Sequence, residues 1–415
     1  MQSSIPLGWQ ELRIGQIARE ISQRNRNSAD IPVLSVTKHN GFVRSSEYFT
    51  RSVHSDDTSN YKIVRKGQFA YATIHLDEGS IALLKDFEHG LISPMYTVFE
   101  ASSALVCSDY LFLCLKRFAL SGRFDPYSNG GVNRRKSISF GDLKAFRFAL
   151  PPLTEQRAIV EVLGAMEEAI TKSEALIGEL SAGKGHILKL YEAESASAPK
   201  MKLRSMVKSL TAGVSVGGEA RGKYDHEFGV LRTSSVSSGI FLPDQLKVIS
   251  EDNLDRVATN PKADCIIISR ANTPELVGAS AYVRENHNNV FLSDKLWQID
   301  IRDRKSVNVR WLSLVLGTPR MRKMMSVRAN GTSSSMQNIS KSAFLGLEVS
   351  VPAIKVQNAI ADAADVFETR QLQEQSYLNA LKSTRAALAQ ELLSGRLRLP
   401  ESMIARHREK SERAA

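Results

Sequence analysis

The chain has 415 residues, 42% hydrophobic and 24% charged, which suits a soluble protein of two or three globular domains. Lysine and arginine outnumber aspartate and glutamate by 55 to 44, and the net charge of +11 favours a polyanionic partner, nucleic acid or an anionic membrane surface. The N-terminus has no secretory pattern, the most apolar window (104–115) is too short to span a bilayer, and the three cysteines form no C-x-x-C pair, so we expect a cytoplasmic protein with reduced thiols and no membrane segment.

Residues 1–150 predict short strands and one helix. The strand candidates are I-P-V-L-S-V at 31–36, G-Q-F-A-Y-A-T-I at 67–74 and S-I-A-L-L at 80–84, which are rich in β-formers and bounded by turn residues. Asp109–Leu120 has the apolar spacing of a helix.

A long helix is predicted over 151–195, after Pro151-Pro152. Its apolar residues form a heptad seam with polar gaps at Ser173 and Lys184, and Thr154 can cap its start. The seam consists of Ile159, Leu163, Met166, Ile170, Ile177, Leu180, Ile187 and Tyr191. At 1.5 Å per residue, a helix from 154 to 191 is about 57 Å long. The small polar segment 192–200 then marks a domain boundary.

The second half follows the same order. Strands are predicted at F-G-V-L-R-T (228–233), C-I-I-I-S (265–269) and A-S-A-Y-V (279–283), and a single helix over Val309–Met325. A second long helix is predicted over 351–398, with a seam that is weaker at Gln371 and Glu374. Its seam residues are Ile360, Ala364, Phe367, Leu378, Leu381, Leu388 and Leu392. Residues 399–415 are mostly charged and predict a frayed polar tail.

The two halves are an internal repeat. Equivalent residues of the two long helices lie 201 positions apart, as in Ile159/Ile360, and the same offset relates Gln156 to Gln357 and Ile138-Ser139 to Ile339-Ser340. Earlier segments correspond in the same order with small insertions and deletions. We therefore predict an α+β protein in which one globular domain followed by one long helix occurs twice.

Common catalytic signatures are missing from the sequence. It contains no G-x-x-x-x-G-K-[ST], no G-x-G-x-x-G after a strand, no H-E-x-x-H and no Cys/His set at metal-ligand spacing. The N/D-P-P-Y/F tetrapeptide of base methyltransferases is also missing. We therefore expect a binding protein with no catalytic residues, no metal site and no cofactor of its own.

Candidate DNA-binding residues in the first half occupy three loops. A solvated basic loop is the alternative interpretation of 129–139, and a structural histidine is the alternative for His75. Arginine and lysine suit phosphates and guanine, while asparagine can contact adenine. The first loop flanks Gly41, the second follows a predicted strand, and the third is N-G-G-V-N-R-R-K-S-I-S at 129–139. The candidates are Lys38, His39, Arg44, Tyr71, Thr73, His75, Asn133, Arg134, Arg135, Lys136 and Ser137.

The second half offers equivalent loops with different polar residues. N-G-T-S-S-S-M-Q-N-I-S at 330–340 reads alone as a polar turn, but it is the repeat-mate of the basic loop at 129–139. Its recurring residues Asn330-Gly331 and Ile339-Ser340 predict scaffold, and the block between them predicts DNA contacts. The candidates are Thr233, Ser234, Ser235, Arg270, Asn272, Thr273, Lys295, Ser333, Ser334, Ser335, Gln337, Asn338 and Lys341. A shared scaffold with divergent loops indicates that each half reads a different short sequence.

At these residues the chain resembles the specificity (S) subunits of type I DNA restriction–modification systems. P-P-L-T-E-Q-R-A-I at 151–159 is similar to the family's entry into its first conserved helix, although the second helix has Val356-Gln357 at the equivalent of Glu155-Gln156. The phrases S-R-A-N-T-P-E-L-V-G at 269–278, L-S-D-K-L-W at 292–297 and G-T-S-S-S-M-Q-N-I-S at 331–340 are similar to one group of its recognition domains. The resemblance covers essentially the whole chain.

The resemblance implies a domain plan and a division of labour. Target-recognition domains at 1–150 and 200–350 would each read one half of a two-part site in double-stranded DNA. Helical spacers at 151–195 and 351–398 would pair as an antiparallel coiled coil, with 399–415 as the tail. They would dock two methyltransferase (M) subunits, and restriction (R) subunits would complete the complex. S-adenosylmethionine, ATP and Mg²⁺ would belong to those partners, and this chain would not be an enzyme.

Two other functions remain open at this point. The chain could be a self-contained DNA-modifying enzyme, which would transfer a methyl group or nick DNA without partners. It could also be a helical assembly scaffold whose basic charge binds DNA without sequence preference, in which case binding would weaken steeply with salt. Because the loops of the two halves differ, the specificity-subunit hypothesis predicts an asymmetric DNA site.

Overall fold

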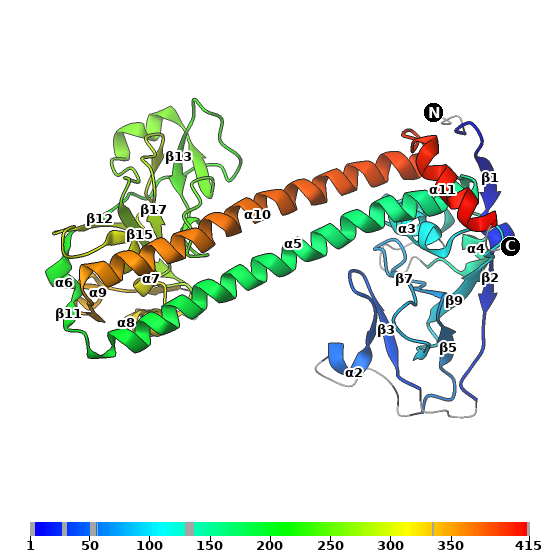
Figure 1. Ribbon diagram of the computed structural model, residues 1–415, viewed down its shortest axis with the longest axis horizontal. Coiled ribbons are helices and arrows are strands. Elements are labelled where there is room, and N and C mark those ends of the chain that lie inside the picture. Colours follow the sequence, from blue (N-terminus) through cyan, green and yellow to red (C-terminus); the bar gives the residue numbers. More distant parts are fainter. Residues whose placement is uncertain are drawn as a thin grey trace. The chain divides into compact units, whose positions relative to one another are not determined.

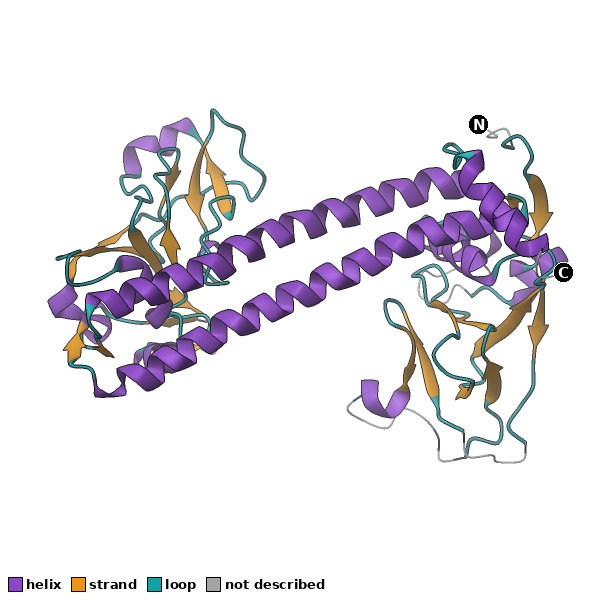
Figure 2. Ribbon diagram, in the orientation of Figure 1, coloured by secondary structure: helices purple, strands orange, loops and turns teal. Residues whose placement is uncertain are grey.

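The computed structural model describes residues 5–26, 31–49, 55, 57–128, 137–333 and 336–412. The chain divides into two compact units, unit 1 (residues 1–172 and 378–415) and unit 2 (residues 173–377). Each unit contains a β-rich domain packed on segments of both long helices, α5 (Leu153–Glu194) and α10 (Ile354–Ser394) (Figures 1 and 2). Within the described ranges, no helix is long and apolar enough to cross a bilayer.

Unit 1 holds the first set of elements. Its strands are β1 (Gln10–Arg13), β2 (Ala18–Ile21), β3 (Leu34–Thr37), β4 (Gly41–Arg44), β5 (Lys62–Arg65), β6 (Phe69–Ala72), β7 (Ile81–Leu83), β8 (His89–Ile92), β9 (Tyr96–Ala101) and β10 (Arg147–Leu150). Its helices are α1 (Ile14–Ile17), α2 (Ser45–Tyr48), α3 (Ser108–Leu120), α4 (Phe140–Leu143) and, at the C-terminus, α11 (Glu401–Glu412).

Unit 2 holds the second set. Its strands are β11 (Lys200–Lys202), β12 (Val207–Ala212), β13 (Phe228–Leu231), β14 (Leu246–Ile249), β15 (Cys265–Ser269), β16 (Ala271–Asn272), β17 (Ser280–Val283), β18 (Val290–Phe291), β19 (Leu296–Ile301), β20 (Asn330–Ser333), β21 (Met336–Asn338) and β22 (Glu348–Ser350). Its shorter helices are α6 (Leu203–Met206), α7 (Val309–Leu316), α8 (Pro319–Arg328) and α9 (Lys341–Leu345).

The same antiparallel sheet is built in both units, which confirms the α+β repeat. The strand order is β2-β9-β6-β7 in unit 1 and β12-β19-β15-β17 in unit 2. β15 has three consecutive isoleucines and is buried at every position, as expected for a strand covered on both faces. A parallel pairing also recurs, between Val33 and Leu91 in unit 1 and between Val230 and Phe291 in unit 2.

The recurring scaffold residues have the same structural roles in both units. Ile138 and Ile339 are buried, and Ser139 and Ser340 cap α4 and α9 by accepting a hydrogen bond from a backbone N–H of the first turn. Gly331 packs against its hairpin partner so closely that a Cβ there would lie 2.4 Å from the Met336 carbonyl oxygen. The prediction of a scaffold role is therefore confirmed for Gly331, Ile339 and Ser340, whereas Asn129 and Gly130 lie outside the described residues.

Each long helix is joined to its β-rich domain by one buried glutamine. The Gln156 side chain accepts from the Cys107 N–H at 2.8 Å and donates to the Pro151 and Leu105 carbonyls at 2.8 and 3.2 Å. Gln357, 201 residues later, makes the same three bonds in unit 2, accepting from the Asn308 N–H at 2.9 Å and donating to two carbonyls at 2.8 and 3.0 Å. This glutamine fixes the start of each long helix against the start of a domain helix, α3 or α7.

The long helices pair antiparallel within each unit, and the polar gaps of their seams meet each other. In unit 2 the Ser173 hydroxyl donates to the Glu374 carboxylate at 2.7 Å, and the Lys184 ammonium donates to the Glu368 carboxylate at 2.9 Å. In unit 1 the Arg385 guanidinium lies 2.8 Å from the Glu167 carboxylate, and these two residues are the repeat equivalents of Lys184 and Glu368. Ser173 and Glu374, which each weaken one seam, therefore pair across the coiled coil.

Unit 2 carries a buried ionic cluster that unit 1 does not repeat. Its members are Arg310 on α7, Arg284 after β17, and Asp365 and Glu368 on α10. Arg310 donates to the two carboxylates at 2.6 Å each, and Arg284 donates to the same pair at 2.9 and 3.2 Å. At the repeat equivalents of Arg310 and Asp365, unit 1 has Asp109 and Gly164. The cluster thus joins domain to helix in the second half alone.

The helix predicted over Val309–Met325 is in fact two helices. α7 ends at Leu316, and α8 starts at Pro319 with the Thr318 side chain accepting a hydrogen bond from the Met321 N–H. Proline at the first position of α8 has no N–H to continue α7, and Thr318 supplies a new cap. The apolar periodicity continues through this break, which is why the pattern alone predicted one helix.

The prediction of a frayed tail after residue 399 is wrong for residues 401–412, which form α11. Ile404 on this helix is buried, and the His407 imidazole lies 2.8 Å from the Glu161 carboxylate of α5. Just before α11, Arg398 forms a two-pronged ion pair with Glu155, whose side chain is 2% exposed. A single buried isoleucine and pairing with distant carboxylates hold this segment, and a local sequence pattern shows neither.

Candidate nucleic-acid interface

Two candidate segments that are far apart in the sequence form one small sheet in unit 2. β16 pairs with β21 so that Asn272 lies opposite Gln337, and β21 pairs with β20. Next to this sheet, the Ile339 N–H donates to the Arg270 carbonyl at 2.9 Å. The S-R-A-N-T phrase and the S-S-S-M-Q-N phrase are therefore neighbours in space.

Arg270 links this sheet to a second candidate residue. Its N–H donates to the Lys295 carbonyl at 2.9 Å, and its guanidinium lies over the ring of Trp297, 5.8 Å from the centroid. Trp297 is buried in the core, so the stacked arginine is held against a rigid surface. Arg270 and Lys295 are thus neighbours through their backbones.

Lys295 also lines a basic hollow in unit 2. The hollow contains three cations, Arg232, Lys247 and Lys295, against one acid, Asp294, and Thr233 contributes a hydroxyl. The complete lining is Ser215, Val216, Val230, Leu231, Arg232, Thr233, Lys247, Ser293, Asp294 and Lys295. This charge excess lies beside Arg270, because Lys295 both lines the hollow and accepts from the Arg270 N–H through its carbonyl, and such a group of cations suits a polyanion.

Three predicted residues of unit 2 have local structural roles. Ser235 is fully buried in the turn after β13 and is wrong as a DNA contact, because its side chain does not reach the surface. Ser234 donates to the Gln245 side chain at 3.0 Å, and the Asn272 side chain accepts from the Thr273 N–H at 2.9 Å. Ser234 and Asn272 were predicted to contact DNA, and in the structure their side chains make hydrogen bonds that order their own loops.

The remaining described candidates of unit 2 differ in exposure. Asn338 and Lys341 are exposed, and the Lys341 ammonium donates to the Leu210 carbonyl at 3.0 Å. Gln337 is half-buried, and its Oε1 atom is enclosed without a hydrogen-bond donor among the described residues. Ser333 ends β20. Ser334 and Ser335 lie outside the described residues.

In unit 1 the loop between β3 and β4 presents Lys38 and His39 to solvent. The loop is held from below by Lys116 of α3, whose ammonium donates to the Lys38 carbonyl at 2.7 Å and also to the Gly79 carbonyl. Burial of Lys116, together with the nearby Lys38 charge, lowers the pKa of its ammonium. Arg44 at the end of β4 is exposed and lies 3.6 Å from the Glu47 carboxylate.

Tyr71 is wrong as a DNA contact. Its side chain is fully buried in β6, its hydroxyl donates to the Ile138 carbonyl at 3.1 Å, and burial raises the pKa of the phenol. Thr73 is half-buried, and its carbonyl accepts from the Ile138 N–H just as the Arg270 carbonyl accepts from Ile339. His75 is exposed beside Glu78, at 3.3 Å. Tyr71 belongs to strand β6 itself and not to the loop that follows it, and the strand places its side chain in the core.

Replacing Tyr71 by Phe should leave the DNA sequence preference unchanged and lower the free energy of unfolding of unit 1 by about 1 kcal/mol, because one buried hydrogen bond is lost. Denaturant titration and binding to a fixed DNA set would measure the two effects. A changed base preference would contradict the burial of this side chain.

The basic loop 129–139 is described only from residue 137 onward. Ser137 is half-buried. Asn133, Arg134, Arg135 and Lys136 lie outside the described residues, so their part in DNA binding stays a prediction.

Three cationic residues at or near the candidate DNA-binding loops were not predicted from the sequence. Lys247 belongs to the Leu246–Ile249 strand and Lys116 to a helix, where a charged residue reads as an ordinary solvated position. Arg232 ends the predicted strand F-G-V-L-R-T and could have been chosen by the same rule that chose Arg270, because both follow a buried run. The pairing that groups Lys247 with Lys295 is long-range and has no local signal.

Metal and thiol chemistry finds no support in the described ranges. Within them no three His, Cys, Asp or Glu side chains gather as ligands for a metal ion. Burial raises the pKa of the Cys114 and Cys265 thiols to about 12, which keeps them protonated and unreactive at neutral pH.

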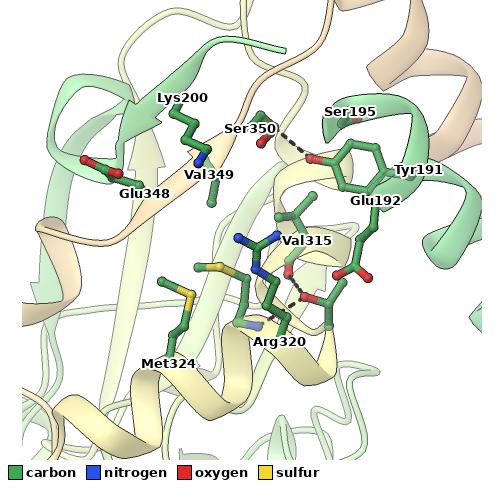
Figure 3. Close-up of a pocket in the computed structure, with 12 residues that line it drawn as sticks. Tyr191, Glu192, Ser195, Lys200, Val315, Arg320, Met324, Glu348, Val349 and Ser350 are labelled. Carbon is green, nitrogen blue, oxygen red and sulfur yellow. Dashed lines mark hydrogen bonds between the residues drawn. The ribbon is translucent and has the colours of Figure 1, made fainter. Parts of the chain in front are cut away.

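A separate cavity in unit 2, with a volume of about 110 Å³, lies where the end of α5 meets β22 and α8 (Figure 3). Its wall includes the apolar side chains of Val315, Met321 and Met324, and Tyr191 closes one side by donating to the Ser350 carbonyl at 2.8 Å. Burial raises the pKa of Tyr191 to about 12. No predicted site residue lines this cavity, so it belongs to the junction between helix and domain.

Comparison with known proteins gives one family and one fold. Residues 6–181 match the family described as "Type I restriction modification DNA specificity domain". The "Type I restriction enzyme EcoEI specificity subunit" of Escherichia coli is 22% identical over 170 residues, which are 41% of this chain. The matched part spans 28% of that subunit's length.

Two solved structures share the fold along nearly the whole chain. The crystal structure of the type-I restriction–modification system S subunit from M. genitalium has a TM-score of 0.60 and 13% identity, covering 94% of this chain and 97% of that one. A structure described as "Structural basis underlying complex assembly andconformational transition of the type I R-M system" has a TM-score of 0.51 and 16% identity, covering 95% of this chain and 100% of that one. Residues 6–181 therefore resemble the type I restriction–modification DNA specificity domain, and the chain as a whole is related to these two structures by its fold.

Proposed function

We propose that the chain is the non-catalytic specificity subunit of a type I restriction–modification complex and reads an asymmetric, two-part DNA site. The observation that carries this proposal is the contrast between a repeated scaffold and unrepeated polar residues. Gln156 and Gln357 make the same three bonds, whereas Thr73 in unit 1 occupies the position of Arg270 in unit 2. Two copies of one recognition domain that differ in their contact residues are suited to bind two different half-sites.

The partners and cofactors are part of this proposal and rest on the similarity to type I specificity subunits. The coiled coil would dock methyltransferase subunits, two in number, and restriction subunits would join them. S-adenosylmethionine, ATP and Mg²⁺ would act on those subunits, and the complex would work in the cytoplasm. The basic hollow of unit 2 supports double-stranded DNA as the ligand of this chain, because three cationic side chains and only one acidic side chain line it.

The test is to co-express the chain with its methyltransferase partner and map modified adenines in the host genome. We expect a two-part motif with a gap of constant length and free sequence. Exchanging residues 1–150 for another recognition domain should change one half of the motif and leave the other intact. Methyl transfer by the purified chain alone, or a motif without two parts, would refute the proposal.

A further inference from the structure

We propose that Arg270 reads a guanine in the half-site of unit 2. This inference rests on the proposed function, namely that unit 2 binds one half of a DNA site. The residue would determine specificity at one base pair, and the guanidinium would donate to O6 and N7 of guanine from the major groove.

The first reason is that Arg270 is held in place while its charge is left without an acidic partner. Its N–H and carbonyl bond to Lys295 and Ile339 at 2.9 Å each, and its side chain lies over the buried ring of Trp297. Within the described residues no carboxylate forms an ion pair with it, and its Nε atom is enclosed without an acceptor. An ordered guanidinium with unused donors is prepared for a ligand that supplies acceptors.

Arg310 in the same unit shows what a structural arginine does here. It is 5% exposed, and its guanidinium donates to Asp365 and Glu368 at 2.6 Å each. The fold thus supplies Arg310 with two carboxylates. Arg270 departs from that pattern at the position where the two candidate segments meet.

The second reason is that a neighbouring hydrogen-bond acceptor, on Gln337, is also enclosed without a partner among the described residues. Gln337 lies on β21, the strand that pairs with β16 directly after Arg270, and its Oε1 atom is enclosed without a donor among the described residues. Buried side-chain polar atoms are rarely left without partners, and among the described residues a donor on Arg270, just before β16, and an acceptor on β21 are both left without one. A base edge carries both acceptors and donors and would satisfy both side chains at once.

The third reason is the surrounding charge. Lys295, bonded through its carbonyl to Arg270, lines the hollow that also contains Arg232 and Lys247. These cations can contact the phosphates on either side and hold the duplex in register, while Arg270 contacts the base. Phosphate contacts position the duplex and base contacts specify its sequence, and the surface offers groups for both.

The test uses the full chain in its methyltransferase complex, with Arg270→Lys as the main variant. Lysine keeps the positive charge but lacks the planar fork that donates to O6 and N7 together. We expect the variant to accept other bases at one position of the unit 2 half-site, which the exchange of residues 1–150 identifies. Binding of a duplex with the mapped G·C pair should weaken by about 5- to 150-fold, and a duplex altered at that pair should lose little further.

Two comparisons separate base reading from other roles. Arg396→Ala removes the same charge from an exposed residue of unit 1, and it should leave the motif unchanged. Arg270→Ala should relax the same single position as Arg270→Lys. A motif that stays unchanged in Arg270→Lys, with affinity near that of the parent, would assign Arg270 to a phosphate and overturn this inference alone. Failure of the parent complex to give any two-part motif would overturn the proposed function and this inference with it.

Discussion

Replacing Glu368 by Gln is expected to lower the free energy of unfolding of unit 2 by about 3–5 kcal/mol. The Glu368 side chain is 5% exposed and accepts from Lys184, Arg310 and Arg284 at 2.9, 2.6 and 3.2 Å. Removing its charge leaves Arg310, which is 6% exposed, with half of its neutralisation. The large cost of a broken buried pair comes from the charge that remains, rather than from the lost attraction.

The repeat supplies a matched control, Glu167→Gln. Glu167 stands 201 residues earlier and pairs with Arg385 at 2.8 Å, but its side chain is 56% exposed. An exposed pair contributes about 0–1 kcal/mol, so this substitution should cost less than 1 kcal/mol. Denaturant titration of the full chain in a Trp9→Phe background would report unit 2 through Trp297 and Trp311. Equal losses in the two variants would contradict the role of burial.

The same cluster should make unit 2 sensitive to acid. Burial opposes ionisation of Asp365 and Glu368, but the charges and hydrogen bonds of Arg310, Arg284 and Lys184 outweigh it and hold the pKa of both carboxyls below their usual values. A carboxyl whose pKa is lower in the folded state contributes stability that is present above its unfolded pKa and is lost as the pH falls through the folded pKa. Unit 2 should therefore lose stability below about pH 4, and Glu368→Gln should show a smaller part of that loss.

The sequence predicted the features that depend on periodicity and repetition. The heptad seams, the strands β6, β7, β15 and β17 of the two four-stranded sheets, and the roles of Ile339 and Ser340 needed only local pattern and comparison of the two halves. The offset of 201 residues also paired Gln156 with Gln357, although it did not reveal that both are buried joints. A repeat shows which residues are equivalent, and the structure shows what they contact.

The errors at Tyr71, at Ser235 and in the C-terminal tail share a physical cause, because each depends on contacts between residues distant in the chain. Tyr71 and Ser235 are polar residues beside loops, and the packing of other strands decided that they are buried. α11 is held by Glu161 and by the burial of Ile404, neither of which its own charged sequence suggests. For the binding surface, the sequence named Arg270 and Lys295 separately, and only the fold placed them together.

Replacing either buried glutamine by Leu is the second change with a large expected effect. Gln156→Leu should lower the free energy of unfolding of unit 1 by about 3 kcal/mol or more, because it leaves the Cys107 N–H and the Leu105 and Pro151 carbonyls without their partner. Gln357→Leu should do the same in unit 2. Hydrogen exchange of the intact chain would locate each effect, in peptides around residue 107 or around residue 308, with the other unit serving as the internal control.

The two substitutions should differ in one respect. α7 has a second cap, because the Asn308 side chain accepts from the Trp311 N–H at 2.9 Å and donates to Asn358 at 2.8 Å. α3 begins after Cys107, which provides no side-chain cap, so Gln156 alone among the described side chains secures that N–H. The first turn of α3 should therefore lose more protection in Gln156→Leu than α7 loses in Gln357→Leu. Equal loss at both helices would mean that the asparagine cap contributes nothing once the glutamine is gone, and that the repeated joint alone determines how each domain helix begins.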